Sequence, residues 1–243
     1  MMARPCPSPE WRPTGNGARA LVLDVLGLTF DDLRHSLGAG AHELKALRAE
    51  YRSLLAAGAP AGDLTADLLP VVHRIEDGEL TKLVQRTRDH LEIESVVVPM
   101  QRYGRAWRTL CVSSQIDCAL GCTFCETAQL GLLRNLTPSE IVSQVVTARV
   151  LSDAPVRNVV FMGMGEPLDN FGAVVQAIRV LTDRCGLSMG WDRITISTVG
   201  RTEGIRRLAA LGWKRLNLAV SLNAPNDEIR SAIMPINRLE PME

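Results

Sequence analysis

The sequence lacks any long apolar run, and no stretch approaches the ~20 residues that a membrane-spanning helix needs. Its opening segment, MMARPCPSPEWRPTGNG, has no apolar centre of the kind found in secretory signals, and its proline and glycine content predicts a disordered leader over 1–17. We therefore expect a cytoplasmic protein with no membrane partner. In that reducing compartment, clustered cysteines are more often metal ligands or catalytic groups than disulfides.

The sequence also lacks net charge, because 27 basic residues balance 27 acidic ones. Over 18–90, 9 Lys or Arg stand against 11 Asp or Glu, and this excess of acid does not favour contact with a phosphate backbone. The basic side chains of Arg102, Arg105, Arg108 and Arg134 are expected to gather nearer the cysteines. They would form either a solvated face or an RNA contact.

With 243 residues, of which 46% are apolar, the chain is long enough for one α/β domain and a small N-terminal addition. Apolar residues at helical spacing around Leu47 and Leu54 predict helix through 18–57, ended by Gly58. After 107, four strands alternate with helices, which indicates a parallel β/α sheet or barrel. The predicted division is a leader (1–17), a helical region (18–78), short β-strands (79–106) and a β/α barrel (107–243).

Cysteine is scarce, with six in the chain, yet four of them fall in the stretch CVSSQIDCALGCTFCE. Cys118, Cys122 and Cys125 have the spacing C-x3-C-x2-C. A structural zinc site needs four protein ligands, the four histidines lie upstream without a His-x3–5-His pair, and Cys111 is awkwardly placed as a fourth. Three thiolates on a [4Fe–4S] cluster would leave one iron open to a substrate. We favour the cluster and keep zinc as the alternative.

Polar motifs follow the predicted strands of the β/α region. GMGEP (163–167) follows the strand at 157–162, Ser197 ends the strand at 193–198, and SLNAP (221–225) follows the strand at 215–221. Since the carboxyl ends of barrel strands face one mouth, these motifs predict one polar pocket beside the cysteines. Taken singly, each motif could equally be a tight turn or a strand-end cap.

Five segments together resemble the RlmN/Cfr-type radical S-adenosylmethionine (SAM) family over 91–238: CVSSQIDCALGCTFC, GLLRNLTPSEIVSQV, NVVFMGMGEPLDN, ITISTVG and SLNAPNDEIRSAIMPINR. Its members methylate C2 or C8 of an adenine in 23S rRNA, and the C2 enzymes also act on tRNA. The resemblance implies a partial radical SAM (β/α) barrel, with about four of six units present, and a small N-terminal helical plus β addition. It implies a [4Fe–4S] cluster and SAM as cofactors, RNA as substrate, and a reducing electron donor such as flavodoxin or ferredoxin.

The resemblance also assigns roles to residues by position. Cys118, Cys122 and Cys125 match the cluster ligands. Glu94 matches the family's proposed general base, and Cys111 matches the cysteine that resolves the covalent protein–RNA intermediate by thiol–disulfide exchange. The positions that match SAM contacts are Gly165, Glu166, Ser197, Ser221, Leu222 and Asn223. Asn223 stands where the family usually has His.

The sequence departs from the family after the fourth β/α unit, where family members continue for roughly a hundred residues that include a methyl-carrying cysteine. Cys6 and Cys185 are poorly placed to replace it. We therefore expect that these 243 residues alone do not complete the methyl transfer. Two alternatives stay open: a radical SAM enzyme acting on another substrate, and an inactive cluster- or metal-binding remnant.

Overall fold

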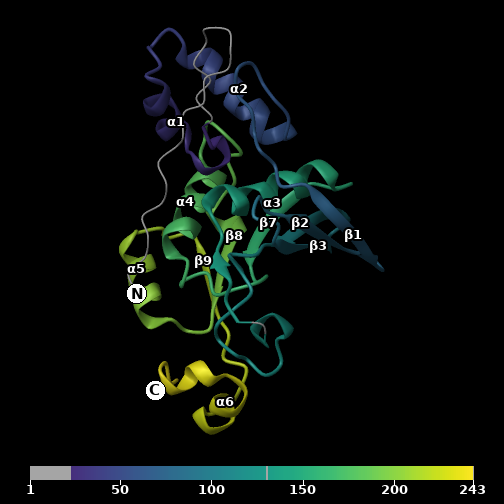
Figure 1. Ribbon diagram of the computed structural model, residues 1–243, viewed down its shortest axis with the longest axis vertical. Helices are drawn as coiled ribbons and strands as arrows, with labels where there is room; N and C mark the ends of the chain where they lie inside the picture. Colours follow the sequence, from purple (N-terminus) through teal and green to yellow (C-terminus); the bar gives the residue numbers. More distant parts are fainter. Residues whose placement is uncertain (1–22, 130, 243) are drawn as a thin grey trace.

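The computed structural model describes residues 23–129 and 131–242 (Figure 1). The predicted leader and Cys6 lie outside the described residues. The helices are α1 (Phe30–Leu37), α2 (Leu44–Ala57), α3 (Pro138–Leu151), α4 (Phe171–Thr182), α5 (Thr202–Ala210) and α6 (Asp227–Ile233), with short 3-10 turns η1 (Val25–Gly27), η2 (Glu126–Gln129), η3 (Trp191–Arg193) and η4 (Pro235–Arg238). The strands are β1 (Val71–Asp77), β2 (Leu80–Arg86), β3 (Glu92–Arg102), β4 (Arg105–Cys111), β5 (Gln115–Ile116), β6 (Arg134–Asn135), β7 (Val156–Phe161), β8 (Ile194–Thr198) and β9 (Asn217–Val220).

Seven strands form one sheet in the order β1-β2-β3-β4-β7-β8-β9, and β5 pairs separately with β6. The strands β1 to β4 pair antiparallel, whereas β4, β7, β8 and β9 run parallel. Parallel neighbours need a crossover, and α3, α4 and α5 supply it after successive strands. This arrangement confirms the predicted partial β/α barrel with a β-rich and helical N-terminal addition.

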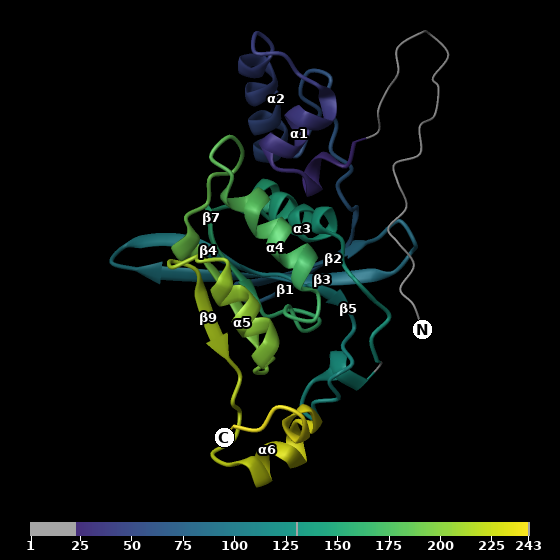
Figure 2. The same ribbon diagram turned by 90° about the vertical axis from the view of Figure 1, so that its left-hand side faces the viewer.

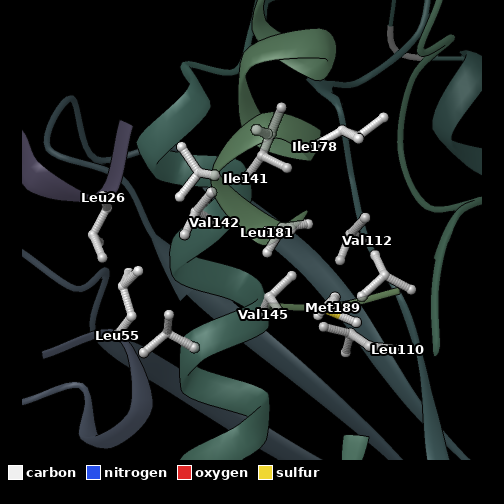
Figure 3. Packing of buried hydrophobic residues seen from close by; sticks show 14 of the residues in the cluster. Leu26, Leu55, Leu110, Val112, Ile141, Val142, Val145, Ile178, Leu181 and Met189 are labelled. Atoms are coloured by element: carbon white, nitrogen blue, oxygen red, sulfur yellow. The ribbon is translucent and has the colours of Figure 1, made fainter. Parts of the chain in front are cut away.

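Helix α3 lies between two layers. Figure 2 shows α3 and α4 on one face of the sheet, with α1 and α2 stacked beyond them. The sheet side of α3 meets Leu110 and Val112, and the other side meets Leu26 and Leu55 (Figure 3). Ile141, Val142, Val145, Val146 and Ala148 of α3 are all fully buried. The main core therefore runs from the sheet through α3 to the N-terminal helices.

Polar residues of α3 also make specific contacts inside this core. The Gln144 side chain accepts from the Ser113 amide at 2.9 Å and donates to its carbonyl at 3.1 Å. Ser143 Oγ accepts from the Leu69 amide at 2.9 Å, and Thr147 Oγ1 accepts from the Gln85 side chain at 3.1 Å. These bonds satisfy buried polar groups and set the position of α3 against both layers.

Local sequence signals explain where the helices begin and end. Thr137 and Glu140 form the predicted capping box at the start of α3, with Pro138 in the first turn. Asn226 caps α6 by accepting from the Ile229 amide at 2.9 Å, as its residue type predicted. Gly58 ends α2 with a φ of 63°, a left-handed conformation that glycine adopts without strain.

The N-terminal region differs from the predicted helical pattern in two places. A left-handed Gly38 separates α1 from α2, so that 18–57 is not one continuous helix. Residues 71–77 form strand β1, inside the range expected to be helical. Because β1 is largely exposed, the alternation that would have identified it as a strand is absent from VVHRIED, and only its pairing with β2 defines it. The proposed division into 1–17, 18–78, 79–106 and 107–243 stays a prediction.

The expected arginine cluster near the cysteines is wrong for three of its members. Arg102 pairs with Arg105 at the β3–β4 turn, and Arg108 lies at the start of the parallel pairing with β7. Cys111, at the other end of β4, leads to the cysteines. A seven-residue strand spans about 20 Å, so closeness in sequence does not bring these arginines to the cysteine end.

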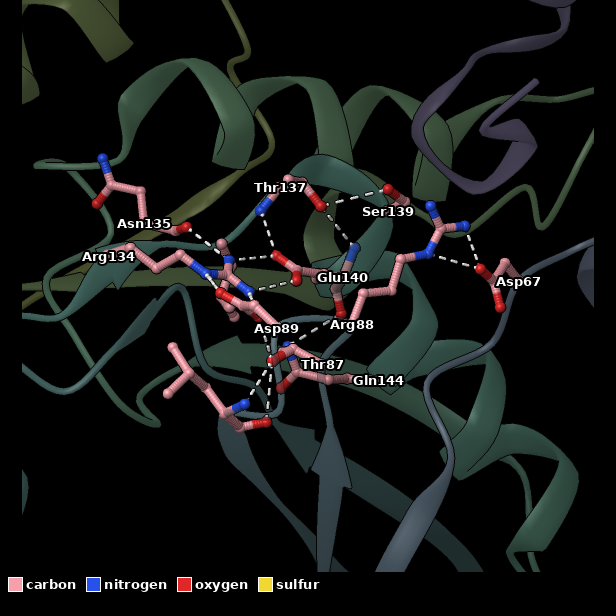
Figure 4. A network of polar contacts seen from close by, with 12 residues as sticks. Asp67, Thr87, Arg88, Asp89, Arg134, Asn135, Thr137, Ser139, Glu140 and Gln144 are labelled. Atoms are coloured by element: carbon pink, nitrogen blue, oxygen red, sulfur yellow. Dashed lines mark hydrogen bonds and ion pairs between the residues drawn. The ribbon is translucent and has the colours of Figure 1, made fainter. Parts of the chain in front are cut away.

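Arg108 and Arg134 of that set are each held by acidic side chains of this chain. Arg108 forms a two-point contact with Asp153, with distances of 2.9 and 3.1 Å. Arg134 binds Asp89 at 2.7 Å and Glu140 at 2.8 Å, which links the β2–β3 turn to the first turn of α3 (Figure 4). Both guanidinium groups therefore form ion pairs within the chain that connect separate elements of the fold.

Candidate active site

A cavity of about 510 Å³ opens where β7, β8 and β9 end. Its walls come from the cysteine loop, from the loops after these strands and from the segment after α6. Among its lining residues are most of those predicted from the sequence: Cys118, Cys122, Cys125, Gly163, Gly165, Glu166, Ser197, Ser221, Leu222 and Asn223. The prediction that these strand ends share one mouth is thus correct for segments that lie about a hundred residues apart in the sequence.

The cysteine loop forms one wall of the cavity. Cys118 and Cys122 are 7% exposed, and Cys125 is half-buried. Met234 and Ile236 pack against these cysteines, and the Thr123 amide donates to the Ile233 carbonyl at 2.9 Å. Helix α6 and the turn that follows it therefore hold the cysteine loop in place.

The three thiols fit an iron–sulfur cluster by donor chemistry. They come from one loop, face one cavity and form no disulfide within the described part of the chain. Within the described ranges, no three His, Cys, Asp or Glu side chains converge on a single-ion site. A [4Fe–4S] cluster does not require such convergence, because each thiolate binds a different iron. Burial raises the pKa of the Cys118 and Cys122 thiols, so that metal binding must also displace their protons.

Glu166 lies in the GMGEP turn and is buried, with 2% of its surface exposed. Its Oε1 accepts from the Leu168 amide at 3.0 Å, and its Oε2 accepts from the Val199 amide at 2.9 Å. The carboxylate therefore joins the loop after β7 to the loop after β8. Burial is the largest influence on this carboxyl and raises its pKa, against a lowering by these hydrogen bonds. Each oxygen already accepts one backbone hydrogen bond, which leaves fewer lone pairs free to accept from an ammonium group.

Gly165 allows the same turn to lie close to β5. Its φ is 91°, and a Cβ added there would lie 2.4 Å from Gln115 Cβ. Gln115 in turn accepts from the Glu166 amide through Oε1 at 2.8 Å. Glycine at position 165, the second glycine of GMGEP, is thus required both by the backbone conformation and by the lack of space for a Cβ.

The loops after β8 and β9 meet at two serines. Ser197 Oγ and Ser221 Oγ lie 3.4 Å apart, and the Ser221 amide donates to the Thr198 carbonyl at 2.8 Å. Asn223 has a φ of 59°, in the left-handed region where Asn, Asp and His are enriched among non-glycine residues. This conformation gives a physical reason why asparagine is tolerated at position 223.

Glu94 and Cys111 lie beside the cavity and do not line it. Cys111 pairs with Val96 across β4 and β3, so strand alternation places Glu94, two residues from Val96, on the same sheet face as Cys111. This face is opposite the one that α3 covers, where Leu110 and Ile93 are buried. Glu94 Oε2 is 3.0 Å from Lys82 Nζ, and burial raises the pKa of the half-buried Cys111 thiol.

Sequence reasoning missed Arg230 and Met234. Met234 lines the cavity and is 1% exposed, and Arg230 is 2% exposed in α6 behind the cavity wall. Nothing in NDEIRSAIMPINR distinguishes Arg230 from a solvent-facing helical arginine.

Comparison with known proteins gives the family. Residues 112–242 match the Radical SAM superfamily. A probable dual-specificity RNA methyltransferase RlmN 1 from Protochlamydia amoebophila is 53% identical over 175 residues, covering 72% of this chain and 48% of the relative. The dual-specificity RNA methyltransferase RlmN of Geobacter sulfurreducens is 40% identical over 239 residues, covering 91% of this chain and 64% of the relative.

A solved structure agrees with these sequences. The crystal structure of a radical SAM methyltransferase from Sphaerobacter thermophilus superimposes with a TM-score of 0.77 at 35% identity, covering 89% of this chain and 68% of that one. The chain spans roughly half to two thirds of the length of the curated relatives it matches. From the matched superfamily region, these relatives and the shared fold, the chain belongs to the RlmN/Cfr-type family of radical SAM methyltransferases.

Proposed function

We propose that this chain provides the cluster- and SAM-binding part of a radical SAM methyltransferase that modifies an adenine of RNA. The observation that carries the proposal is the cavity, because it combines three cysteine thiols with the polar ends of three parallel strands. Relatives are named dual-specificity RNA methyltransferase and, in Nitrosopumilus maritimus, ribosomal RNA large subunit methyltransferase N. These names support RNA, and large-subunit ribosomal RNA in particular, as the substrate. In this proposal the substrate is 23S rRNA, with tRNA as a second one.

In this proposal Cys118, Cys122 and Cys125 hold a [4Fe–4S] cluster. Such a cluster, when bound and reduced by a donor such as flavodoxin or ferredoxin, supplies the electron that breaks the sulfonium bond of SAM. The residues that orient SAM are Gly165, Glu166, Ser197, Ser221, Leu222 and Asn223. Glycine at position 165 lets a ligand approach the backbone, and the hydroxyl and amide side chains offer donors and acceptors.

The adenine would lie over the open sheet face beside the cavity. Glu94 and Cys111 lie on this face of the sheet, and in the proposal the base sits between them and the cavity. Glu94 would remove a proton from the substrate. Cys111 would then attack the sulfur of the methyl-carrying cysteine in the protein–RNA intermediate, so that a disulfide forms as the carbon–sulfur bond to the adenine's methyl carbon breaks and that carbon takes up a proton. Lys82, bound to Glu94, helps to hold that carboxylate in position.

A second candidate is a radical SAM enzyme with another substrate. Residues 18–90 carry more acidic than basic side chains, and Arg108 and Arg134 are bound by acidic side chains of the chain itself. Both observations disfavour a phosphate-binding surface. An RNA-binding assay separates the candidates, because the first requires salt-dependent binding of a 23S rRNA hairpin and the second does not.

Anaerobic reconstitution tests the shared part of both candidates. The protein should bind about four irons per chain, and Cys118→Ala, Cys122→Ala and Cys125→Ala should each abolish binding. Cys111→Ala is the matched control and should keep the full iron content. With dithionite and SAM, the unsubstituted protein should release 5′-deoxyadenosine. Stoichiometric zinc without iron would contradict the proposal.

The methyl-carrying cysteine is a separate matter. Among the described cysteines that have no proposed role, Cys185 follows α4 at the opposite end of the sheet, where its carbonyl accepts from Arg52. We therefore expect no methylated adenine from the 243 residues alone, measured by mass spectrometry of digested RNA. Robust methylation would show that Cys111 or Cys185 carries the methyl group.

A further inference from the structure

Arg230 is a buried cation whose bonds go to loop carbonyls. Its Nε donates to the Leu222 carbonyl at 3.1 Å, and its guanidinium also donates to the carbonyls of Val199 and Glu240 and to the Asn237 side chain. Arg230 is 2% exposed and does not line the cavity. It therefore acts on the cavity through the groups that it binds.

Two of these groups belong to cavity walls. Val199 follows β8 directly after Ser197 and Thr198, and Leu222 lies between Ser221 and Asn223 after β9; both line the cavity. The planar guanidinium presents five donors in a fixed fork, so it can hold both carbonyls at once in one geometry.

The same helix reaches the cysteine loop. Ile233, three residues after Arg230, accepts from the Thr123 amide through its carbonyl, and Met234 packs against Cys118 and Cys122. On the far side, Asn237 accepts from Arg230 and donates to Asp227 at 2.9 Å, which folds η4 back onto α6. Helix α6 thus connects the cysteine loop with the loops after β8 and β9, and Arg230 makes two of those connections.

We propose that Arg230 is the positioning residue of the SAM cavity: it fixes the loops at 197–200 and 221–223 relative to the cysteine loop before any ligand binds. The inference rests on the proposed function, since it assigns SAM to this cavity. Lysine keeps the charge but carries a compact ammonium on a flexible stem, so it cannot hold the same carbonyls together. Charge alone would therefore not restore the arrangement.

Hydrogen exchange on the metal-free protein tests the positioning directly. Arg230→Gln and Arg230→Lys should each accelerate exchange of the Val199 and Ser221 amides about tenfold, because a lost charged hydrogen bond changes local opening by at least that factor. Exchange in α3 should be unchanged. The matched control Arg206→Gln replaces an arginine of α5 whose side chain is 74% exposed, and should alter neither region. Unchanged loop exchange would overturn the proposal, and so would faster exchange in α3, since that would indicate a general structural role.

Binding of S-adenosylhomocysteine to the reconstituted proteins gives the second readout. By calorimetry, both Arg230 variants should bind about tenfold more weakly than the unsubstituted protein, and Arg206→Gln should bind equally well. Loss of iron from both Arg230 variants with unchanged α3 exchange would also support positioning, because α6 holds the cysteine loop. Equal affinity at equal iron content would overturn it. If the unsubstituted protein itself holds no iron and binds no S-adenosylhomocysteine, the proposed function fails and the exchange result still decides the role of Arg230.

Discussion

Glu166 and Arg230 hold the backbone of one residue, Val199, from its two sides. Glu166 Oε2 accepts from the Val199 amide at 2.9 Å, and the Arg230 guanidinium donates to the Val199 carbonyl. The two buried charges do not form an ion pair with each other in the described structure, and the peptide groups of Val199 lie between them. The loop after β8 is therefore fixed by the loop after β7 on one side and by α6 on the other.

The first prediction concerns the pH dependence that Glu166 brings. Burial raises its pKa above the usual value of 4.5, so the folded protein holds this proton more tightly than the unfolded chain does. The free energy of unfolding should consequently fall as the pH rises from about 4.5 through the folded pKa. Glu166→Gln, which cannot ionise, loses one backbone acceptor and should be less stable in acid by about 1–3 kcal/mol.

The difference between Glu166→Gln and the unsubstituted protein should shrink as the pH rises, because only the unsubstituted protein has the cost of ionising a buried carboxyl. Urea denaturation across this pH range measures it. Glu203→Gln is the control, since the Glu203 side chain is 76% exposed. A difference that is constant with pH would contradict the prediction.

A second prediction concerns Asp89. Hydrogen bonds from Arg134, and then from Thr87, hold the pKa of Asp89 well below its usual value of 3.8. A carboxylate of this kind stabilises the fold above its unfolded pKa, and that contribution is lost as the pH falls through the folded value. Because the Asp89 side chain is about half exposed, Asp89→Asn should cost at most about 1 kcal/mol at neutral pH, and less in high salt.

The Asp89 effect should depend on Arg134. In a double-mutant cycle with Arg134→Met, the cost of Asp89→Asn should fall to the part contributed by the Thr87 hydrogen bond, whereas the exposed Asp63→Asn should be neutral in both backgrounds. An undiminished cost in the Arg134→Met background would show that Asp89 acts through another partner.

The third prediction uses two glycines of neighbouring segments. Gly165→Ala should destabilise the protein by more than about 1 kcal/mol, because its φ of 91° and the 2.4 Å approach to Gln115 both oppose a Cβ. Gly172→Ala, in the first turn of α4 with no neighbouring atom within 4 Å of the added Cβ, should be neutral or stabilising by up to about 1 kcal/mol. Thermal denaturation of both variants compares them. Equal effects would mean that the GMGEP turn can relax around the added methyl group.

The fourth prediction concerns the edge of the sheet. Strand β9 is the last strand of the order, and its Leu218 and Val220 are 42% and 45% exposed. An apolar edge strand without charges favours pairing between chains. Leu218→Lys should therefore reduce self-association in sedimentation velocity. Ile75→Lys on β1, the opposite and charge-rich edge, is the control and should change nothing.

Sequence predicted those features that depend on local pattern. The caps at Thr137 and Asn226 follow from side chains that bond to backbone a few residues away, and the shared cavity follows from the direction of parallel strands. Arg230 could not be predicted, because its burial depends on η4 folding back over α6. Arg102, Arg105 and Arg108 were wrongly expected near the cysteines, because residues close in sequence can lie up to about 20 Å apart along a seven-residue strand.

Helix α3 shows what its position between two layers means for sequence change. Because neighbours cover it on both sides, every residue of its central turns (141–148) is buried, and none faces solvent only. A larger side chain at position 146 would press on the turn at Gly58, because a Cβ added to Gly58 would already lie 3.2 Å from Val146 Cγ1. A larger side chain at position 145 would press on the sheet (Figure 3). A change of side-chain size in this helix must therefore be compensated by substitutions in two separate parts of the chain. Sequence changes in the N-terminal helices and in the barrel are coupled through α3.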